Sequence, residues 1–435
     1  MRNTAKEHLR MKNLFARLRK NAVIDTLCTL EGNAKPCLYL EPLWGIPYNL
    51  YAPLASVYMA ALGLSPTQIG LISTVFLASQ MCWALLSGVL TDKLGRRTCT
   101  AVFDCISWTI PALLWTFAQD FRWFAAAAVF NGAWRVTETS WDLLMIEDAP
   151  ESRLVHMYTL TSIAGLLAGF VSPIAYFFVQ KFTIVPTMRF IYGFTCVMMT
   201  SKFVILYFLS KETSVGKRRM EECRGVSLFS RLWDSRKVFF RMLRSRRILL
   251  TVAFVACYSG ICNVNGTFWP LLITDKLGIP TEDLSIFFTI KNLFMLVCYF
   301  VVAPRLDVRR FRHPVLLGLC LLIAQQLLML LMPAGAYWPV VLAVVLEALA
   351  LSILDPMRGS LQMINIDREE RARMLSYFYA MCMLTTSPLS WLAGVAAEAD
   401  RALPFAMNLV LTLIACGLIC ILWKERRTDI DGEAA

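Results

Sequence analysis

A charged stretch of ten residues, Gly88 to Arg97, most constrains what this chain can fold into, because it separates two long apolar runs. The runs, 66–90 and 98–118, are each long enough to cross the roughly 30 Å of bilayer hydrocarbon as a helix, which takes about 20 residues. Two membrane helices with so short a connection must be antiparallel neighbours. The connection holds one acid and three bases, and bases in short loops mark the cytoplasmic side. The sequence therefore predicts a cytoplasmic hairpin.

The letters of this hairpin follow the pattern G-x-x-x-D-R/K-x-G-R-R/K. All six specified positions match, namely Gly88, Asp92, Lys93, Gly95, Arg96 and Arg97. The pattern resembles the loop between helices two and three of the major facilitator superfamily, where it locks the two halves of a transporter together while the outside is open. The resemblance implies a gating hairpin here. The spacing alone predicts only a charged hairpin, and a chance turn with a solvated charge run is the alternative.

The composition is that of a polytopic membrane protein. Of 435 residues, 57% are hydrophobic and 17% are charged, whereas soluble domains carry about 25% charged residues. Twelve spans would use about 250 residues at the usual span length. We expect an all-α fold with twelve spans, at 37–62, 66–90, 98–118, 122–146, 155–180, 187–209, 248–273, 283–303, 314–333, 337–361, 371–396 and 403–423. Prolines at 42, 47 and 53 are expected to break up the first span.

The chain repeats itself after its midpoint. The stretch Asp148–Tyr158 resembles Asp367–Tyr377, and Pro304–Arg310 is a degraded copy of the hairpin without its glycines. The resemblance to the superfamily implies two pseudo-symmetric six-helix bundles with the substrate site between them. We expect these parts: a basic cytoplasmic segment 1–35, a bundle 36–210, a cytoplasmic linker 211–247 containing a surface helix, a second bundle 248–424, and a cytoplasmic tail 425–435.

The distribution of basic residues predicts the orientation. Of the 43 Lys and Arg residues, 35 fall in the termini and loops on one side of the predicted spans, and five fall on the other. This asymmetry predicts a multi-pass protein of the cell membrane with both termini in the cytoplasm. It also explains the net charge of +12 without a nucleic-acid partner. The first 35 residues fit an interfacial helix on the lipid bilayer or a flexible tail equally well.

Ionisable residues inside spans are costly, so they indicate function. In the predicted fourth span, Arg135, Glu138 and Asp142 lie at i, i+3 and i+7 and share one helical face. Arg135 and Glu138 can pair along the helix, whereas Asp142 has no cation one turn away. The alternative is a structural ion pair that holds this span to a neighbour.

Spans one, four, seven and ten line the central cavity in the superfamily. The resemblance therefore implies a substrate and proton pathway made of Glu41, Arg135, Glu138, Asp142, Asn263, Asn265, Trp269, Glu347 and Asp355. Interhelical hydrogen bonds are the alternative for either asparagine. Asp104, Lys202 and Lys291 also lie inside spans, and the sequence does not assign their partners.

The resemblance to the superfamily implies that two acids at the inner end of the fourth span, Glu147 and Asp148, belong to the gating hairpin. Arg96 is expected to pair with Glu147 or Asp148. Asp92 is expected to face the N-terminal end of the eleventh span, where the helix dipole is positive.

The sequence holds no nucleotide-binding loop, no metal-ligand spacing and no nucleophile elbow, and its 14 cysteines form no C-x-x-C pair. We expect no enzyme, no cofactor and no metal, and a monomer. The expected function is secondary active transport of a small organic solute by proton-coupled efflux. Proton-coupled uptake of a sugar or other metabolite, or a sensor that transports nothing, is the alternative. Gly165–Pro173 faintly resembles the span-five motif of antiporters in the superfamily and supports efflux slightly.

Overall fold

A computed structural model describes residues 27–149, 154–225, 236–302, 311–364 and 371–433, and every regular element in these ranges is helical. Most of the predicted basic segment 1–35 lies outside the described residues. So do Pro304–Arg310 and the beginning of the second repeat, 367–370.

The first half of the chain forms a bundle that ends at residue 209. Its helices are α3 (Ala34–Tyr39), α4 (Pro42–Tyr51), η1 (Ala52–Leu54), α5 (Ala55–Ala61), α6 (Pro66–Leu94), α7 (Arg96–Asp104), η2 (Cys105–Thr109), α8 (Ile110–Phe117), α9 (Phe121–Asn131), α10 (Trp134–Ile146), α11 (Leu154–Gly169), α12 (Pro173–Phe182) and α13 (Ile184–Leu209). The prolines break up the first span as expected, because Pro42 begins α4 and Pro53 lies in η1.

The second half forms a second bundle. Its helices are α17 (Arg246–Leu271), η4 (Leu272–Lys276), η5 (Thr281–Asp283), α18 (Leu284–Val301), α19 (Arg312–Leu331), α20 (Tyr337–Ile364), α21 (Arg371–Ala399) and α22 (Leu403–Glu433). The last helix continues for ten residues beyond the predicted span end at 423, because no glycine or proline lies between 424 and 431 to interrupt it. Arg358 lies inside α20.

The predicted number of twelve membrane spans is not confirmed by the length and composition of the described helices. Within the described ranges, nine helical segments are long and apolar enough to cross a membrane, so twelve remains a prediction. The three other predicted spans differ from these nine. The first is divided by its prolines, and the fourth is divided into α9 and α10 at Gly132 and Ala133. The eighth corresponds to α18, which has 18 residues.

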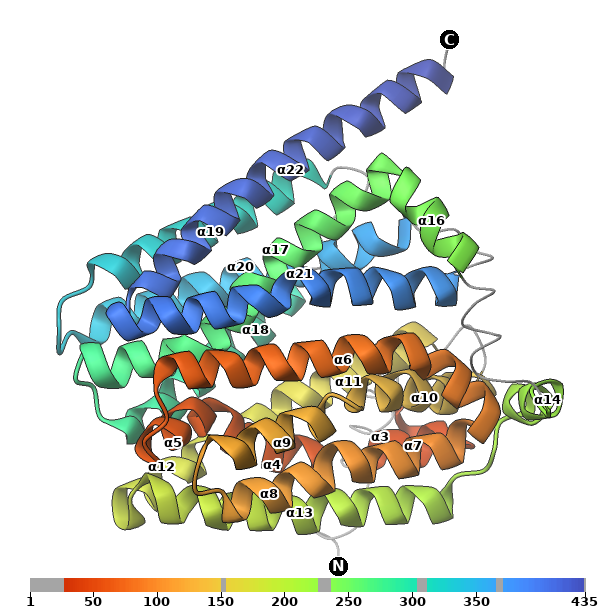
Figure 1. Ribbon diagram of the computed structural model, residues 1–435, viewed down its shortest axis with the longest axis horizontal. Helices are drawn as coiled ribbons and strands as arrows, with labels where there is room; N and C mark the ends of the chain where they lie inside the picture. The colour runs from red at the N-terminus through yellow and green to blue at the C-terminus, as the bar shows by residue number, and fades with distance from the viewer. Residues whose placement is uncertain (1–26, 150–153, 226–235, 303–310, 365–370, 434–435) are drawn as a thin grey trace, which may run out of the picture.

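The two bundles lie on either side of a central pair of helices, α6 and α21, which run side by side in opposite directions (Figure 1). We name the two ends of this pair. The linker end is where α6 ends at Leu94, near the linker helices α14 (Ser214–Glu222) and α16 (Arg236–Arg244). The far end is where α6 begins at Pro66. The predicted linker segment thus contains two short helices.

The halves share an apolar core at the far end and separate cores at the linker end. One cluster of buried side chains joins Tyr58 and Tyr192 of the first half to Phe268 and Ala397 of the second. Toward the linker end, the second half has a cluster of its own around Phe378, and the first half has smaller separate clusters. The packing between the halves is therefore concentrated at the far end.

Glycines bring α6 and α21 into backbone contact there. A Cβ on Gly70 would lie 2.4 Å from the carbonyl oxygen of Ser390 and 2.9 Å from the Cα of Gly394. Next to this contact, the hydroxyl of Thr74 donates to the carbonyl of Ser387 at 2.8 Å, and the hydroxyl of Ser387 donates to the carbonyl of Thr74 at 3.0 Å. Only glycine allows so close an approach, so this seam is specific to the sequence.

Candidate functional site

The charged hairpin is tighter than the sequence predicted. Helix α6 continues through Gly88 to Leu94, and Gly95 alone makes the turn, with φ +81°. The prediction that the connection begins at Gly88 is therefore wrong, because Gly88 lies exposed inside the helix. The reason is that the residues after Gly88 keep their helical hydrogen bonds, and the backbone N–H of Gly95 still donates to Thr91 at 3.1 Å. A positive φ then favours glycine at position 95.

Arg96 is the centre of the charge cluster at this turn. It is 3% exposed, and its Nε and Nη2 donate to the two carboxylate oxygens of Glu147 at 3.0 and 2.9 Å. Its Nη1 donates to Asp92 at 3.1 Å. The ion pair expected between Arg96 and Glu147 is therefore present. Asp92 pairs with Arg96, and no contact of Asp92 with α21 is recorded in the described part of the chain. Lys93 is exposed.

The start of the linker completes the cluster through contacts that the sequence did not predict. Glu212 accepts hydrogen bonds from the backbone N–H groups of Arg96 at 2.9 Å and Arg97 at 3.0 Å, and so caps the positive end of α7. The hydroxyl of Thr213 donates to Glu147 at 2.5 Å. The signal in the sequence was an acid followed by Thr and Ser directly after the sixth span.

Asp148 takes a different partner from Glu147. Its carboxylate accepts from the hydroxyl of Ser214 at 2.6 Å and from the backbone N–H of Ser214 at 3.2 Å. These bonds hold the first residue of α14 against the end of α10. The two acids therefore both fasten the linker end, Glu147 through Arg96 and Asp148 through the linker itself.

In the first half, Glu41 pairs with Lys202, a residue whose partner the sequence did not assign. The Lys202 ammonium lies 2.7 Å from Glu41, and both side chains are largely buried. The ammonium also lies 5.8 Å from the ring centre of Trp44 and 5.6 Å from that of Trp141. Aromatic faces attract cations at this distance, so the lysine is held by one acid and two rings.

The polar face predicted on the fourth span is present on α10. Arg135 pairs with Glu138, and its Nη2 donates to Gln80 of α6 at 3.0 Å. Its guanidinium also lies 5.1 Å from the ring centre of Tyr379 on α21, which belongs to the second half. Asp142 is half-buried, and no ion pair is recorded for it in the described part of the chain.

The second half holds a chain of amides that ends on a carboxylate. Gln326 and Asn408 donate to the carbonyl oxygen of Asn265 at 3.1 and 2.9 Å. The amide nitrogen of Asn265 faces Glu347 at 3.4 Å. Glu347 pairs with the ammonium of Lys291 at 2.9 Å, which assigns a partner to the second unassigned lysine.

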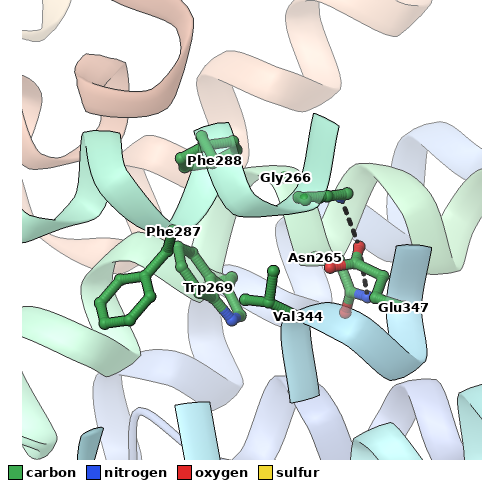
Figure 2. A pocket seen from close by; sticks show the side chains of 8 residues that line it. Asn265, Gly266, Trp269, Phe287, Phe288, Val344 and Glu347 are labelled. Carbon is green, nitrogen blue, oxygen red and sulfur yellow. Dashed lines mark hydrogen bonds and ion pairs between the residues drawn. The ribbon is translucent and has the colours of Figure 1, made fainter. Parts of the chain in front are cut away.

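This acid lies beside a small cavity, which Figure 2 shows from close by. Side chains of α17, α18 and α20 line it, and aromatic rings form much of its wall: it is lined by Asn265, Gly266, Trp269, Phe287, Phe288, Lys291, Val344 and Glu347. The cavity measures about 20 Å³, and a water molecule needs roughly 10–15 Å³ on this scale. In this conformation it therefore has room for water but not for an organic solute.

The remaining predicted site residues lie apart from these groups. Asn263 donates to Ser390 of α21 at 2.7 Å, which makes it an interhelical bond within the second half. The hydroxyl of Tyr258 donates to Asp355 at 2.9 Å, and the guanidinium of Arg358 lies 5.7 Å from the Tyr258 ring centre. The structure therefore divides the predicted pathway into separate polar clusters in the two halves.

Comparison with known proteins agrees with this architecture. The family model described as Major Facilitator Superfamily matches residues 45–264 and 257–434. No curated protein matches the sequence. Among solved structures, a mutant of the nucleoside transporter NupG is 11% identical, with a TM-score of 0.72 over 90% of this chain and 100% of that one. A POT family transporter in complex with 5-aminolevulinic acid is 15% identical, with a TM-score of 0.68 over 89% of this chain and 94% of that one.

Both matches extend over nearly the full length of the solved proteins, and at these identities they show the fold. The two family matches fall on the two halves, which agrees with the internal repeat. The polar clusters described above thus lie within the helices of a multi-pass membrane protein, and the chain belongs to the major facilitator superfamily.

Proposed function

We propose that the protein is a secondary active transporter that moves a small organic solute across the cell membrane by alternating access, in exchange for protons. The linker end would face the cytoplasm, as the distribution of basic residues predicts. The nucleoside and peptide transporters that share the fold support an organic solute.

One observation carries this proposal: both halves hold acid–base pairs inside their predicted spans. Glu41–Lys202 and Arg135–Glu138 belong to the first half, and Lys291–Glu347 to the second. An ionisable group at the bilayer centre costs at least about 2.5–3.5 kcal/mol on insertion scales. Packing alone would favour apolar side chains at such positions, so their presence supports a polar pathway.

Alternating access is supported by the unequal ends of the molecule. At the far end the halves meet through the Gly70–Gly394 contact and a shared apolar core. At the linker end they have separate cores, and the Arg96 cluster holds together elements of the first half and the linker. A rocking motion would open the far-end seam and bring the linker ends together, where the hairpin would act as the gate.

Proton coupling is supported by carboxylates that a proton would release from their partners. Protonation of Glu347 would neutralise it and weaken its hold on Lys291. Asp142 has no ion pair in the described chain and can take up a proton without first losing a cation. We propose export as the direction, since the stretch that resembles the antiporter motif lies between the halves. A Cβ on Gly169 would lie 2.1 Å from the amide nitrogen of Asn292 on α18.

The test is flux in proteoliposomes. A solute panel screened by thermal shift would supply a ligand, and its flux would be measured with and without an imposed pH gradient. We expect flux that follows the gradient and that is lost in the double variant Asp142→Asn/Glu347→Gln. Flux that ignores the gradient, or that the double variant leaves unchanged, would reject proton coupling. A ligand that binds without crossing would reject transport in favour of a sensor.

A further inference from the structure

We propose that Glu347 binds a cationic group of the transported solute, and that the ammonium of Lys291 takes the place of this cation while no solute is bound. The inference rests on the proposed transport function and names the solute class, an organic cation with an apolar or aromatic body. It follows from the cavity of Figure 2, the ion pair at its edge and the rings around it.

The carboxylate is fixed in place by groups that do not neutralise it. Asn265 presents its amide nitrogen to Glu347, and the orientation of Asn265 is set by the two amides that donate to its oxygen. Glu347 is 7% exposed. Its recorded counter-charge, within the part of the chain that the structure describes, is Lys291. The acid is therefore a preformed anionic site whose charge is balanced by one removable side chain.

The walls of the cavity suit a cation that carries apolar groups. The rings of Phe287 and Phe288 meet the ring of Trp269 edge-on, with centres 6.1 and 5.4 Å apart. Aromatic side chains around a carboxylate recognise ammonium groups through their negative faces. The buried indole N–H of Trp269 has no acceptor among the described residues. A solute with a hydroxyl, ether or carbonyl oxygen would satisfy this donor.

The lysine is the mobile member of the pair. Its side chain is 20% exposed, against 9% for that of Glu347. A lysine ammonium is carried on a flexible four-carbon stem, so Lys291 can leave the acid while the acid stays in place. Its departure would add the space of its own head group to a cavity that is too small for a solute in this conformation. The entering cation would restore the charge balance of Glu347.

The first half offers a matched comparison. Lys202 also pairs with a glutamate, but its side chain is only 6% exposed, and its ammonium is already next to two tryptophan rings. Displacing Lys202 would break these ring contacts as well as the ion pair. Of the two pairs, Lys291–Glu347 is therefore the one that a ligand can open. Lys217→Met, at an exposed position of the linker helix α14, serves as the control for removing a lysine charge.

The experiment measures binding of benzyltrimethylammonium to the purified full chain in detergent, by tryptophan fluorescence and thermal shift. The uncharged analogue neopentylbenzene is the comparison ligand. We expect Lys291→Met to bind the cation about tenfold more tightly than the unmodified protein, because removing an internal competitor makes the binding-competent state dominant. Glu347→Gln should lose this binding. Lys217→Met should bind as the unmodified protein does, and neopentylbenzene should not distinguish the variants.

Lys291→Gln is a second variant in case Lys291→Met misfolds, since glutamine can still donate a hydrogen bond to Glu347 without a charge. This variant should also bind the cation more tightly than the unmodified protein. Equal affinity of the cation for the unmodified protein, both Lys291 variants and Glu347→Gln would overturn the inference. So would tighter binding of neopentylbenzene in the Lys291 variants. Because binding is measured without flux, the proposed transport function and the proposed cation site can be rejected independently of each other. Cation binding without transport would remove only the proposed function, and transport of another solute that ignores Lys291 would remove only this inference.

Discussion

The guanidinium of Arg96 forms a two-pronged bond with the carboxylate of Glu147, from Nε at 3.0 Å and from Nη2 at 2.9 Å. Both side chains are largely buried, and the residues are 51 positions apart in the chain. The pair fastens the turn after α6 to the end of α10. Because the planar fork of arginine matches both carboxylate oxygens, lysine cannot reproduce the bond.

The first prediction follows from this geometry. Arg96→Ala leaves Glu147 buried with Thr213 as its remaining recorded partner, and removing one member of a buried pair costs about 3–5 kcal/mol of unfolding free energy. We expect a clearly lower melting temperature in detergent, and an intermediate one for Arg96→Lys. Lys93→Ala, at an exposed position of the same hairpin, is the control and should melt as the unmodified protein does. Equal melting of Arg96→Ala and Lys93→Ala would contradict the prediction.

The second prediction concerns the seam at the far end. Gly70→Ala would place a methyl group 2.4 Å from the carbonyl of Ser390, so α6 and α21 must move apart. We expect the far end to become more accessible, seen as faster labelling of a cysteine introduced at Thr67. Gly193→Ala is the matched control, since Gly193 also lies inside a helix and a Cβ there meets nothing within 4 Å. Unchanged labelling of the Gly70 variant relative to this control would show that the seam does not hold the halves.

The residues that could be predicted from the sequence are those whose position is set locally. Hydropathy placed the long helices, and the run of prolines predicted the broken first span. The hairpin was found because its glycines and charges follow each other closely in the chain. Its exact turn was missed, because helical hydrogen bonds extend through Thr91 and only the positive φ of Gly95 ends them.

The partners of buried charges could not be predicted, because they depend on how distant helices pack. Lys202 meets Glu41 across 161 positions of sequence, and Lys291 meets Glu347 from the neighbouring α18. Arg135 and Glu138 could be paired because they share a helix turn. Glu212 was missed for the same reason as the lysines: it acts on backbone N–H groups at the start of α7, 116 positions away.

The third prediction tests whether Lys202 and Glu41 depend on each other. Lys202→Met leaves Glu41 without its cation inside the bundle, which should cost about 3–5 kcal/mol of unfolding free energy. The double variant Lys202→Met/Glu41→Gln removes both charges and should recover most of that loss. The pair Arg219–Glu222, whose side chains are both 43% exposed, provides the control, since removing an exposed pair changes stability by about 0–1 kcal/mol. A double variant no more stable than Lys202→Met would contradict the coupling.

The fourth prediction concerns pH and the far-end loops. The ammonium of Lys276, after α17, donates to both oxygens of Asp400 at 2.7 and 3.0 Å. This bond, together with the backbone N–H of Ala402, lowers the pKa of Asp400 below its usual value. A carboxylate whose folded pKa is depressed contributes stability above its unfolded pKa of about 3.9, and that contribution disappears as the pH falls through the folded pKa. The contribution is small, because Asp400 is exposed.

Asp400→Asn should therefore lower the melting temperature at pH 7 by a small amount, and the difference should vanish in acid below the folded pKa. The measurement is a melting series from neutral pH to below pH 3 on the unmodified protein and the variant. Arg401→Gln, which removes the neighbouring Arg401–Asp275 pair and leaves Asp400 in place, is the control for general loosening of the loops. A difference between Asp400→Asn and the unmodified protein that stays constant through this range would show that Lys276 holds Asp400 without linkage to its ionisation.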